Sequence, residues 1–364
     1  MSLEAQVTVA SRGVDARLAI DAGSTLALLG PNGSGKSTVL AAIAGTVRPD
    51  AGRVALDGLP LHDLDARRTA WTPPRRRGIA LVTQGHDLFP ALTVLDNVAF
   101  GVRARGVRRA DARDESQHWL ARAGLGDLAE RLPRDLSGGQ ARRVAIVRAL
   151  ASQPRVLLLD EPFAGVDVEA ATALRLLVAE AAADVTTVIT THDALDAHLL
   201  ASEVAVLETG RVVEQGVTAE VLTRPRTRFA AAVAGRVLVA GRAAPGALVT
   251  ADGLRVPADS SGVPDGSEAV VAVAPAAVGM TARTPDSSEP TALTSRAPAG
   301  RAVDTGKAGD GVVHDVVAAL EPRGDVVRVR GRLLAADVAV ADLAVGVGDA
   351  VRFTVPQGLV AYRP

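Results

Sequence analysis

One short run of residues constrains the fold of this chain more than any other feature. The run fits the phosphate-binding loop pattern G-x-x-x-x-G-K-[ST]. It consists of Gly30, Pro31, Asn32, Gly33, Ser34, Gly35, Lys36, Ser37 and Thr38. The apolar segment Thr25–Leu29 precedes it, and Lys36–Ala44 predicts a helix that Gly45 ends. A buried strand that enters a glycine-rich turn and leaves as a helix is typical of an α/β sheet, so we predict an α/β nucleotide-binding domain.

Lys36 is unusual because the chain otherwise avoids lysine. The 364 residues contain 40 Lys and Arg together, of which only Lys36 and Lys307 are lysines. A compact ammonium on a flexible stem can reach phosphate oxygens inside a tight backbone ring, where a planar guanidinium is too wide. We therefore interpret Lys36 as a requirement of phosphate binding. Lys307 lies in a polar, loop-like stretch where any cation would serve.

Further apolar runs predict more strands of the same sheet. They cover residues 78–82, 156–159, 185–189 and 204–207. Continuous runs of Val, Leu and Ile suit parallel strands that are buried on both faces. Residues 93–151 show only helical patterns with many arginines, which predicts a helical insertion on the core sheet.

The composition changes after about residue 236, where short Val-rich segments bounded by Gly, Pro and Asp replace the helical patterns. We predict a domain over 1–235 followed by a small all-β domain over 236–364. The predicted β segments are 268–274, 312–319, 326–330 and 350–355. Residues 283–311 are rich in Pro, Ser, Thr, Ala and Gly, and predict a flexible loop.

Charge and cysteine content limit the possible functions. The formal net charge of −1 argues against a dedicated nucleic-acid binder, which would carry a basic excess. The absence of cysteine excludes disulfides, thiol chemistry and cysteine-type zinc sites, and fits a cytoplasmic protein. The start of the chain lacks the features of a signal peptide, and residues 269–282 are too short to span a bilayer. We therefore expect any membrane role to depend on a partner protein.

Two carboxylates follow an apolar strand at residues 156–159. Asp160 and Glu161 would lie at its carboxyl end, where open α/β sheets place their ligands. In a nucleotide site Asp160 would hold Mg²⁺ together with the Ser37 hydroxyl, and Glu161 would orient or deprotonate the attacking water. The alternative is a solvated acidic turn, which we would favour if the phosphate-binding loop were absent.

A second glycine-containing run predicts a helix start. It consists of Leu136, Ser137, Gly138, Gly139 and Gln140. Ser137 and Gln140 have the S-x-x-Q spacing of a capping box, and Arg142, Arg143 and Arg148 follow on a predicted amphipathic helix. An ordinary capped helix would explain this run alone. An exposed helix N-terminus with a hydroxyl is also a second phosphate-binding position.

The same run is, letter for letter, the signature motif of ATP-binding-cassette (ABC) ATPases, and the chain resembles this family over residues 1–235. The resemblance implies a P-loop NTPase cassette with a helical insertion at about 93–151, followed by a small OB-like β domain. It implies ATP and Mg²⁺ as ligands, and a homodimer in which the signature run contacts the ATP held by the other subunit.

Three further residues match family motifs. Gln84 resembles the Q-loop glutamine, which contacts Mg²⁺ and water. His192 resembles the switch histidine, which contacts the γ-phosphate, and Asp167 resembles the D-loop aspartate, which crosses the dimer interface. The resemblance thus implies Glu161, His192 and Gln84 as catalytic residues and Ser37, Gln84 and Asp160 around the metal.

The chain departs from the family near the adenine site. Family members commonly stack adenine on an aromatic residue close to the N-terminus, but no aromatic residue precedes Trp71 here. Arg12 or Val14 would pack on the base instead. We therefore expect weak base discrimination, with GTP hydrolysed at an appreciable rate.

Residues 73–78 and 88–94 resemble ATPases of bacterial importers, in which Leu88, Phe89 and Leu92 would line the groove that receives a helix of the membrane subunit. Core packing is the alternative for these three residues. The resemblance implies two integral membrane permease subunits and, indirectly, a solute-binding protein that is secreted, periplasmic or a lipoprotein. It implies no nucleic acid, and a peripheral location on the cytoplasmic face of the membrane.

The compact N-terminus and residues 227–235 resemble molybdate importers of high-GC bacteria most. Importers of sulfate, ferric iron, polyamines or sugars are the alternatives, and a soluble non-transport ABC ATPase is an alternative of another class. The Ser-Ala-Arg-Asn run of oxyanion-binding β domains is absent, and residues 295–298 are a poor substitute. Oxyanion sensing and a structural or dimerising role both remain open for the β domain.

Overall fold

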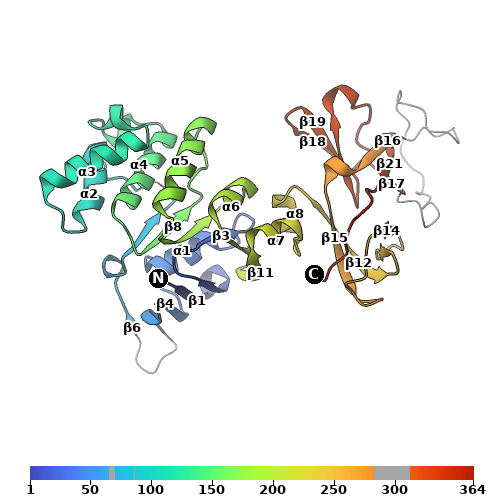
Figure 1. Cartoon of the computed structure of the whole chain (residues 1–364), viewed down its shortest axis with the longest axis horizontal. Helices are drawn as coiled ribbons and strands as arrows, with labels where there is room; N and C mark the ends of the chain where they lie inside the picture. Colours follow the sequence, from blue (N-terminus) through green and yellow to red (C-terminus); the bar gives the residue numbers. More distant parts are fainter. Residues whose placement is uncertain (65–69, 86, 283–311) are drawn as a thin grey trace. The chain divides into compact units, whose positions relative to one another are not determined.

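The computed structural model describes residues 1–64, 70–85, 87–282 and 312–364 (Figure 1). The chain forms two compact units, Met1–Val221 and Leu222–Pro364. Residues before 236 join the second unit because the short helix α8 (Arg228–Val233) packs on its first strand and the Tyr362 hydroxyl donates to the Pro225 carbonyl. The domain limits 1–235 and 236–364 stay a prediction.

The first unit is built on a six-stranded sheet of order β11-β10-β3-β9-β8-β7. Its strands are β3 (Thr25–Leu29), β7 (Ile79–Val82), β8 (Val156–Asp160), β9 (Thr186–Thr190), β10 (Glu203–Glu208) and β11 (Arg211–Val217). All pairs are parallel except the hairpin of β10 and β11. The predicted strands of the parallel sheet are therefore confirmed.

Both faces of this sheet are buried in different cores. Leu26 and Leu158 face a core shared with α1 (Lys36–Ala44), whereas Leu157 and Leu159 face a core shared with helices on the other side. Those helices include α5 (Val168–Ala181); α6 (Ala194–Leu200) also packs on α5. This two-sided burial is the physical reason for the continuous apolar runs.

A second, antiparallel sheet of order β2-β1-β4-β5-β6 packs against the other side of α1. Its strands are β1 (Leu3–Val9), β2 (Val14–Ile20), β4 (Ala51–Leu56), β5 (Leu59–Asp63) and β6 (Ala70–Trp71). The sequence predictions omit this sheet, although β1 and β2 alternate buried and exposed residues as a half-buried strand should.

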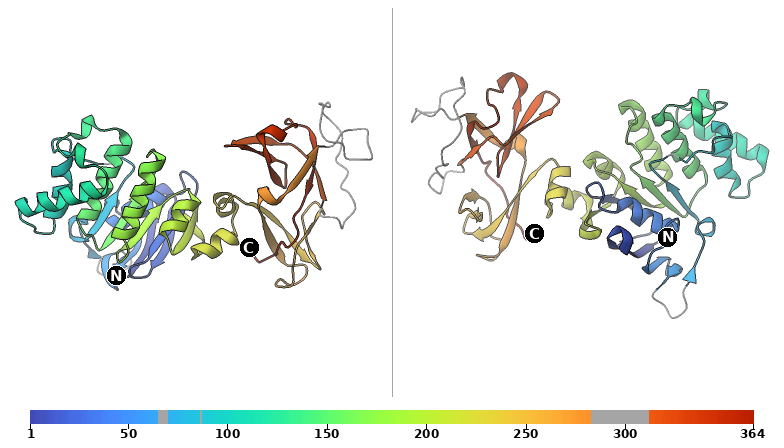
Figure 2. Two further views of the ribbon diagram at one scale, coloured as in Figure 1. Left: turned by 45° about the horizontal axis from the view of Figure 1, so that its top comes forward. Right: turned by 180° about the vertical axis from the view of Figure 1, so that it is seen from behind.

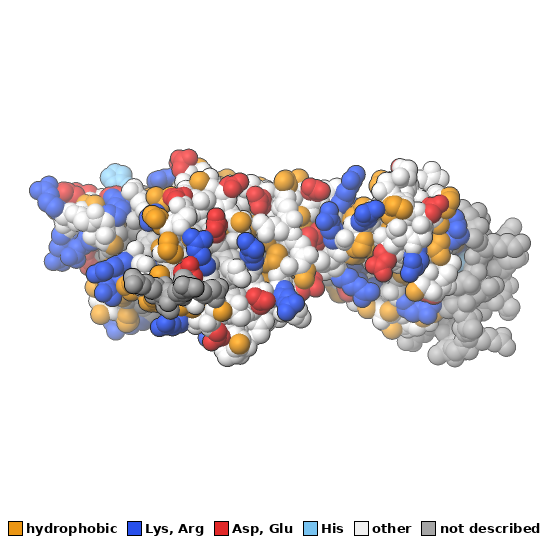
Figure 3. Space-filling view, turned by 90° about the horizontal axis from the view of Figure 1, so that it is seen from below, with side chains coloured by type: hydrophobic (Ala, Val, Ile, Leu, Met, Phe, Trp, Pro, Cys, Tyr) orange, Lys and Arg blue, Asp and Glu red, His pale blue; other side chains and the backbone are white. Residues whose placement is uncertain are grey.

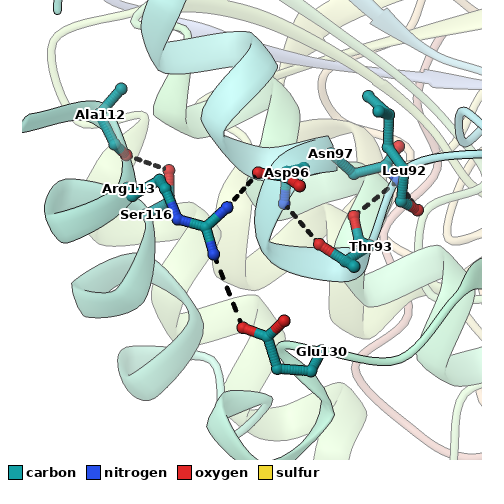
Figure 4. Close-up of polar contacts among 8 residues, drawn as sticks. All are labelled: Leu92, Thr93, Asp96, Asn97, Ala112, Arg113, Ser116 and Glu130. Atoms are coloured by element: carbon teal, nitrogen blue, oxygen red, sulfur yellow. Dashed lines mark hydrogen bonds and ion pairs between the residues drawn. The ribbon is translucent and has the colours of Figure 1, made fainter. Parts of the chain in front are cut away.

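The helical insertion is confirmed. Helices α2 (Val94–Arg103), α3 (Arg109–Arg122) and α4 (Gly138–Ala151) lie together at one end of the first unit (Figures 1 and 2). Thr93 caps α2, and Arg113 of α3 reaches both Asp96 and Glu130 (Figure 4). The buried Asn97 amide donates to the carbonyls of Phe89, Leu92 and Thr93, so the turn before α2 is held against the insertion.

The second unit is all-β apart from short helices, which confirms the predicted small β domain. Its sheets have the orders β14-β13-β12-β15, β16-β21-β17 and β18-β19-β20. The strands are β12 (Val237–Ala244), β13 (Ala247–Val249), β14 (Arg255–Pro257), β15 (Glu268–Val273), β16 (Gly279–Ala282), β17 (Val312–Val316), β18 (Ala319–Arg323), β19 (Val326–Arg330), β20 (Ala335–Ala339) and β21 (Ala350–Thr354). One core that includes Phe353 and Val329 joins them.

The single strand predicted over 312–319 is wrong. It is divided into β17 and the first residue of β18, because the chain changes partner there. The Val317 amide donates to Asp349 before β21, and the Ala318 amide donates to Arg330 at the end of β19. The predicted loop 283–311, including residues 295–298 and Lys307, lies outside the described residues.

Basic and acidic side chains are interspersed over the first unit on the face drawn in Figure 3. Within the described part of the chain, no helix has both the length and the apolar character needed to cross a membrane. The α-helix α7 (Thr218–Thr223), which contains the boundary between the two units, has six residues.

Candidate nucleotide-binding site

The phosphate-binding loop connects β3 to α1 with glycines where the backbone demands them. Gly35 has φ +105°, and a Cβ there would lie 2.5 Å from the Val14 Cγ2 atom. A Cβ on Gly30 would lie 2.2 Å from the Leu207 carbonyl oxygen. The loop therefore packs closely against β2 and β10, and a side chain at Gly30 or Gly35 would force it to move.

The N-terminus of α1 begins at the N-cap residue Gly35. Among the described residues, no side chain caps its first turn. The Ser34 Oγ atom is buried without a hydrogen-bond partner in the described structure. Uncapped amides, the helix dipole and an unpartnered hydroxyl together suit an anion with several oxygens, so the loop fits the phosphates of a nucleotide.

Lys36 is buried inside this loop and is only 6% exposed. Its Nζ donates to the carbonyls of Gly30 at 2.7 Å and Pro31 at 3.1 Å, so one of its three N–H donors remains for a ligand. Burial lowers the pKa of Lys36, and the nearby carboxylates of Glu161 and Asp160 oppose this shift. A bound phosphate would add negative charge and favour the ammonium form further.

A single pocket brings the loop together with two other predicted site residues, Gln84 and Glu161. It is lined by Arg12, Asn32, Gly33, Gly35, Lys36, Ser37, Thr38, Gln84 and Glu161. Gln84 is exposed just after β7, and Glu161 follows β8, so the neighbouring carboxyl ends of two parallel strands deliver them.

Arg12 and Val14 differ in their access to this pocket. Arg12 lines it, and its Nη1 donates to the Thr38 hydroxyl at 3.3 Å. Val14 is buried beneath Gly35 and does not line the pocket. Of the two residues expected to pack on a base, only Arg12 lines this pocket, and its contact with a base stays a prediction.

The acidic pair at the end of β8 is firmly held. Asp160 is 5% exposed and accepts a hydrogen bond from the Thr190 hydroxyl at 2.6 Å. The Glu161 amide donates to the same hydroxyl at 2.9 Å. Glu161 has a left-handed backbone with φ +47°, a strain that persists only where neighbours fix the residue. Because Asp160 is buried, a solvated acidic turn does not describe this pair.

The signature run begins α4 with a complete capping box. The Ser137 Oγ accepts from the Gln140 amide at 3.2 Å, and Gln140 Oε1 accepts from the Ser137 amide at 3.0 Å. The predicted amphipathic character of α4 is wrong: most of the helix is buried, since α2, α3, α5 and β7 all pack against it. Arg142 belongs to this buried surface.

The signature residues line a different pocket from the phosphate-binding loop. The lining is Ser137, Gly138, Gly139, Gln140, Arg142, Arg143, Ala164, Gly165 and Asp167. Asp167 is exposed and caps α5 by accepting from the Ala170 amide at 2.9 Å. His192 is exposed just after β9 and lies outside the lining of the loop pocket. One chain therefore does not bring its signature run or His192 to its own loop pocket.

Comparison with known proteins decides the family. The family profile described as ABC transporter matches residues 14–164. The molybdenum import ATP-binding protein ModC of Mycobacterium tuberculosis (strain ATCC 25618 / H37Rv) is 41% identical over 382 residues, covering 100% of this chain and 97% of that protein. This chain belongs to the ATP-binding proteins of ABC transporters. The predicted α/β fold and the ATP-hydrolysing class of the protein are confirmed.

Two other similarities to this ABC ATPase are partial. The putative 2-aminoethylphosphonate import ATP-binding protein PhnT of Salmonella typhimurium is 41% identical over 226 residues, which cover 60% of this chain and 58% of that protein. A solved dimeric ATP-binding cassette in a post-hydrolysis state with ADP and Pi has a TM-score of 0.54 and 29% identity. It covers 60% of this chain and 99% of its own. The similarity to ModC thus extends over residues that these two do not match.

The sequence predictions for the ABC ATPase omit Thr190 as a site residue, although its hydroxyl joins Asp160 to Glu161. The sequence shows only that Thr190 ends an apolar run. The structure places that end beside Asp160, because β9 pairs with β8. They also assign no role to Arg142, which contacts the backbone of Glu161 and Gln84.

Proposed function

We propose that this ABC ATPase drives the import of molybdate or a related oxyanion. The observation that supports the substrate is the full-length similarity to ModC, which includes the β unit as well as the cassette. The relatives named above are import proteins, which favours transport over a soluble non-transport ATPase.

ATP would be held by the loop of residues 30–38, with its phosphates over the open N-terminus of α1 and beside the Lys36 ammonium. Ser37, Asp160 and Gln84 would hold Mg²⁺, which supplies charge neutralisation on the phosphate oxygens. The described residues contain no cluster of three His, Cys, Asp or Glu side chains, and this site needs none, since a hydroxyl, an amide and one carboxylate supply its ligands.

Glu161 would act as the general base toward the attacking water. Its side chain lines the pocket, and Thr190 fixes its backbone. Phosphoryl transfer depends mostly on positioning and charge stabilisation, so a carboxylate on a fixed backbone near Lys36 suits the reaction. His192 would act at the γ-phosphate once the site closes.

A second copy of the chain would complete each site. The signature pocket with Ser137 and Asp167 lies apart from the loop pocket of its own chain, and the similar cassette of known structure is dimeric. Two ATP molecules would be held between the loop of one subunit and the signature run of the other, so hydrolysis would open the dimer.

The permease subunits would dock beside the helical insertion, on the cytoplasmic face of the membrane. Phe89 is 37% exposed and packs at 4.6 Å on the exposed Phe100, while Arg148 lies over the Phe89 ring. Leu88 is partly buried against the core of the insertion. The turn before α2 would therefore serve both core packing, through Leu88, and docking, through the exposed Phe89. A solute-binding protein would deliver the oxyanion to the permease.

Reconstitution of the ATPase with its permease in lipid vesicles tests the proposal. Molybdate or the related oxyanion tungstate, supplied with a binding protein, should stimulate ATP hydrolysis and enter the vesicles, whereas sulfate, ferric iron, polyamines and sugars should not. Stimulation by one of these solutes instead would overturn the assignment. Calorimetry of the isolated chain with molybdate, tungstate and sulfate would show whether the β unit itself binds an oxyanion.

A further inference from the structure

Arg142 contacts both catalytic segments from the signature helix. One guanidinium nitrogen, Nη1, donates to the Glu161 carbonyl, and the other, Nη2, donates to the Gln84 carbonyl at 3.0 Å. Resting on the proposed function, we propose that Arg142 is a positioning residue, which fixes Glu161 and Gln84 relative to each other and to the signature run at the start of the same helix.

The burial of Arg142 shows that these bonds are its main interactions. The side chain is 8% exposed, and within the described residues it forms no ion pair. Desolvation lowers the pKa of Arg142, and the charges of Glu161 and Asp160 oppose this. A buried cation that directs both ends of its fork to backbone carbonyls is a geometric clamp, because the fork is rigid and presents its donors at fixed angles.

The clamp acts on a strained residue. Glu161 adopts φ +47°, a conformation that is unfavourable for a side chain with a Cβ atom. Thr190 holds its amide nitrogen and Arg142 holds its carbonyl oxygen, so both peptide groups around the strained residue are fixed. The Glu161 carbonyl also accepts from the Ala164 amide at 3.3 Å, so Arg142 is one of two donors to this oxygen. Without Arg142 only this longer hydrogen bond holds the carbonyl, and the general base would lose its orientation while the phosphate-binding loop stays intact.

The clamp also joins two nucleotide sites. Helix α4 begins at the Ser137 cap, which would contact the ATP of the second copy, and carries Arg142 in its next turn. Any shift of this rigid segment when ATP arrives therefore moves the carbonyls of Glu161 and Gln84 in its own chain. Binding in one site would thereby adjust catalysis in the other.

Steady-state ATP hydrolysis by the full chain tests the clamp. Arg142→Gln should lower kcat about ten-fold or more and leave KM within about two-fold, since positioning is lost and ATP binding is kept. Arg142→Lys retains a cation with donors and should recover part of kcat. Arg105→Gln is the matched control, because Arg105 donates to the Ala151 carbonyl at the other end of α4 and should leave kcat unchanged.

The link to the signature run needs a double-mutant cycle. Ser137→Ala and Arg142→Gln should have non-additive effects on kcat if the two residues act through one helix. A kcat of Arg142→Gln within two-fold of the unaltered chain would overturn the positioning role, as would equal losses in Arg105→Gln. Additive effects would overturn the coupling. Hydrolysis without oxyanion uptake by the complex would instead contradict only the proposed substrate.

Discussion

Two helix N-termini in the cassette carry the two motifs, and their local chemistry is opposite. Helix α1 begins at Gly35 without a side-chain cap, whereas α4 begins at Ser137 with both hydrogen bonds of its capping box made. The first turn of α1 also holds a buried lysine, while the first turn of α4 holds no charge.

This difference indicates separate roles in ATP binding. Among the described residues no side chain caps the first turn of α1, so an anion would complete that site and should supply most of the affinity. At α4 the Gln140 amide already donates to the Ser137 hydroxyl, so this amide is not available to ATP. ATP can form hydrogen bonds there only with the donors that the capping box leaves free. We expect α1 to decide whether ATP binds and α4 to decide how the dimer responds.

The largest expected effect is that of replacing Lys36 at the start of α1. Lys36→Arg should reduce ATP-driven dimer closure and hydrolysis by about 100-fold or more, because the guanidinium cannot occupy the position between the Gly30 and Pro31 carbonyls. Nucleotide titration and turnover measure this. Lys307→Arg makes the same chemical change elsewhere and should alter neither quantity; a fully active Lys36→Arg chain would remove the main argument for α1.

A second test separates binding at α1 from chemistry. Glu161→Gln should lower kcat by a factor of about 100 to 1,000, since the general base is lost. ATP affinity should be preserved, and the chain should accumulate as an ATP-bound dimer in size-exclusion chromatography. Turnover at a near-normal rate would show that another residue is the base.

A third test compares two caps of the same kind. Ser137→Ala and Thr93→Ala should each lower the free energy of unfolding by about 1 kcal/mol, because each removes a side-chain acceptor from a helix N-terminus. Only Ser137→Ala should also reduce kcat, by about ten-fold, with ATP binding to the isolated chain unchanged. Equal kinetic effects would mean that α4 contributes only stability.

The smallest expected effect concerns discrimination between the adenine and guanine bases of the nucleotide. ATP and GTP should differ in kcat/KM by less than about ten-fold, because no aromatic residue precedes Trp71 and none of the described residues lining the loop pocket is aromatic. Stacking of the adenine on an aromatic ring would be worth about 1 kcal/mol. Arg12→Ala should lower the binding affinity for ATP and for GTP by a similar factor of a few-fold. Competition between the two nucleotides measures the ratio, and a strong preference for ATP would contradict the expectation.

The sequence predicted features that adjacent residues encode. The phosphate-binding loop, the capping box and the parallel strands each depend on a contiguous run, whose glycines, cap residues or apolar side chains act within a few positions. The sequence predictions omit the antiparallel sheet because β1 and β2 bury only one face. Their alternating buried and exposed residues give a weaker apolar signal than the continuous runs of β3 and β8.

Only the tertiary structure decided how the site residues are held. Thr190 reaches Asp160 across 30 positions, and Arg142 reaches Gln84 across 58. Such contacts depend on which strands lie side by side and on which helix covers them, and no local pattern specifies either. The sequence by itself determined the chemical groups for ATP, whereas the packing of β8, β9 and α4 determined their orientation, because orientation is fixed by partners distant in the chain.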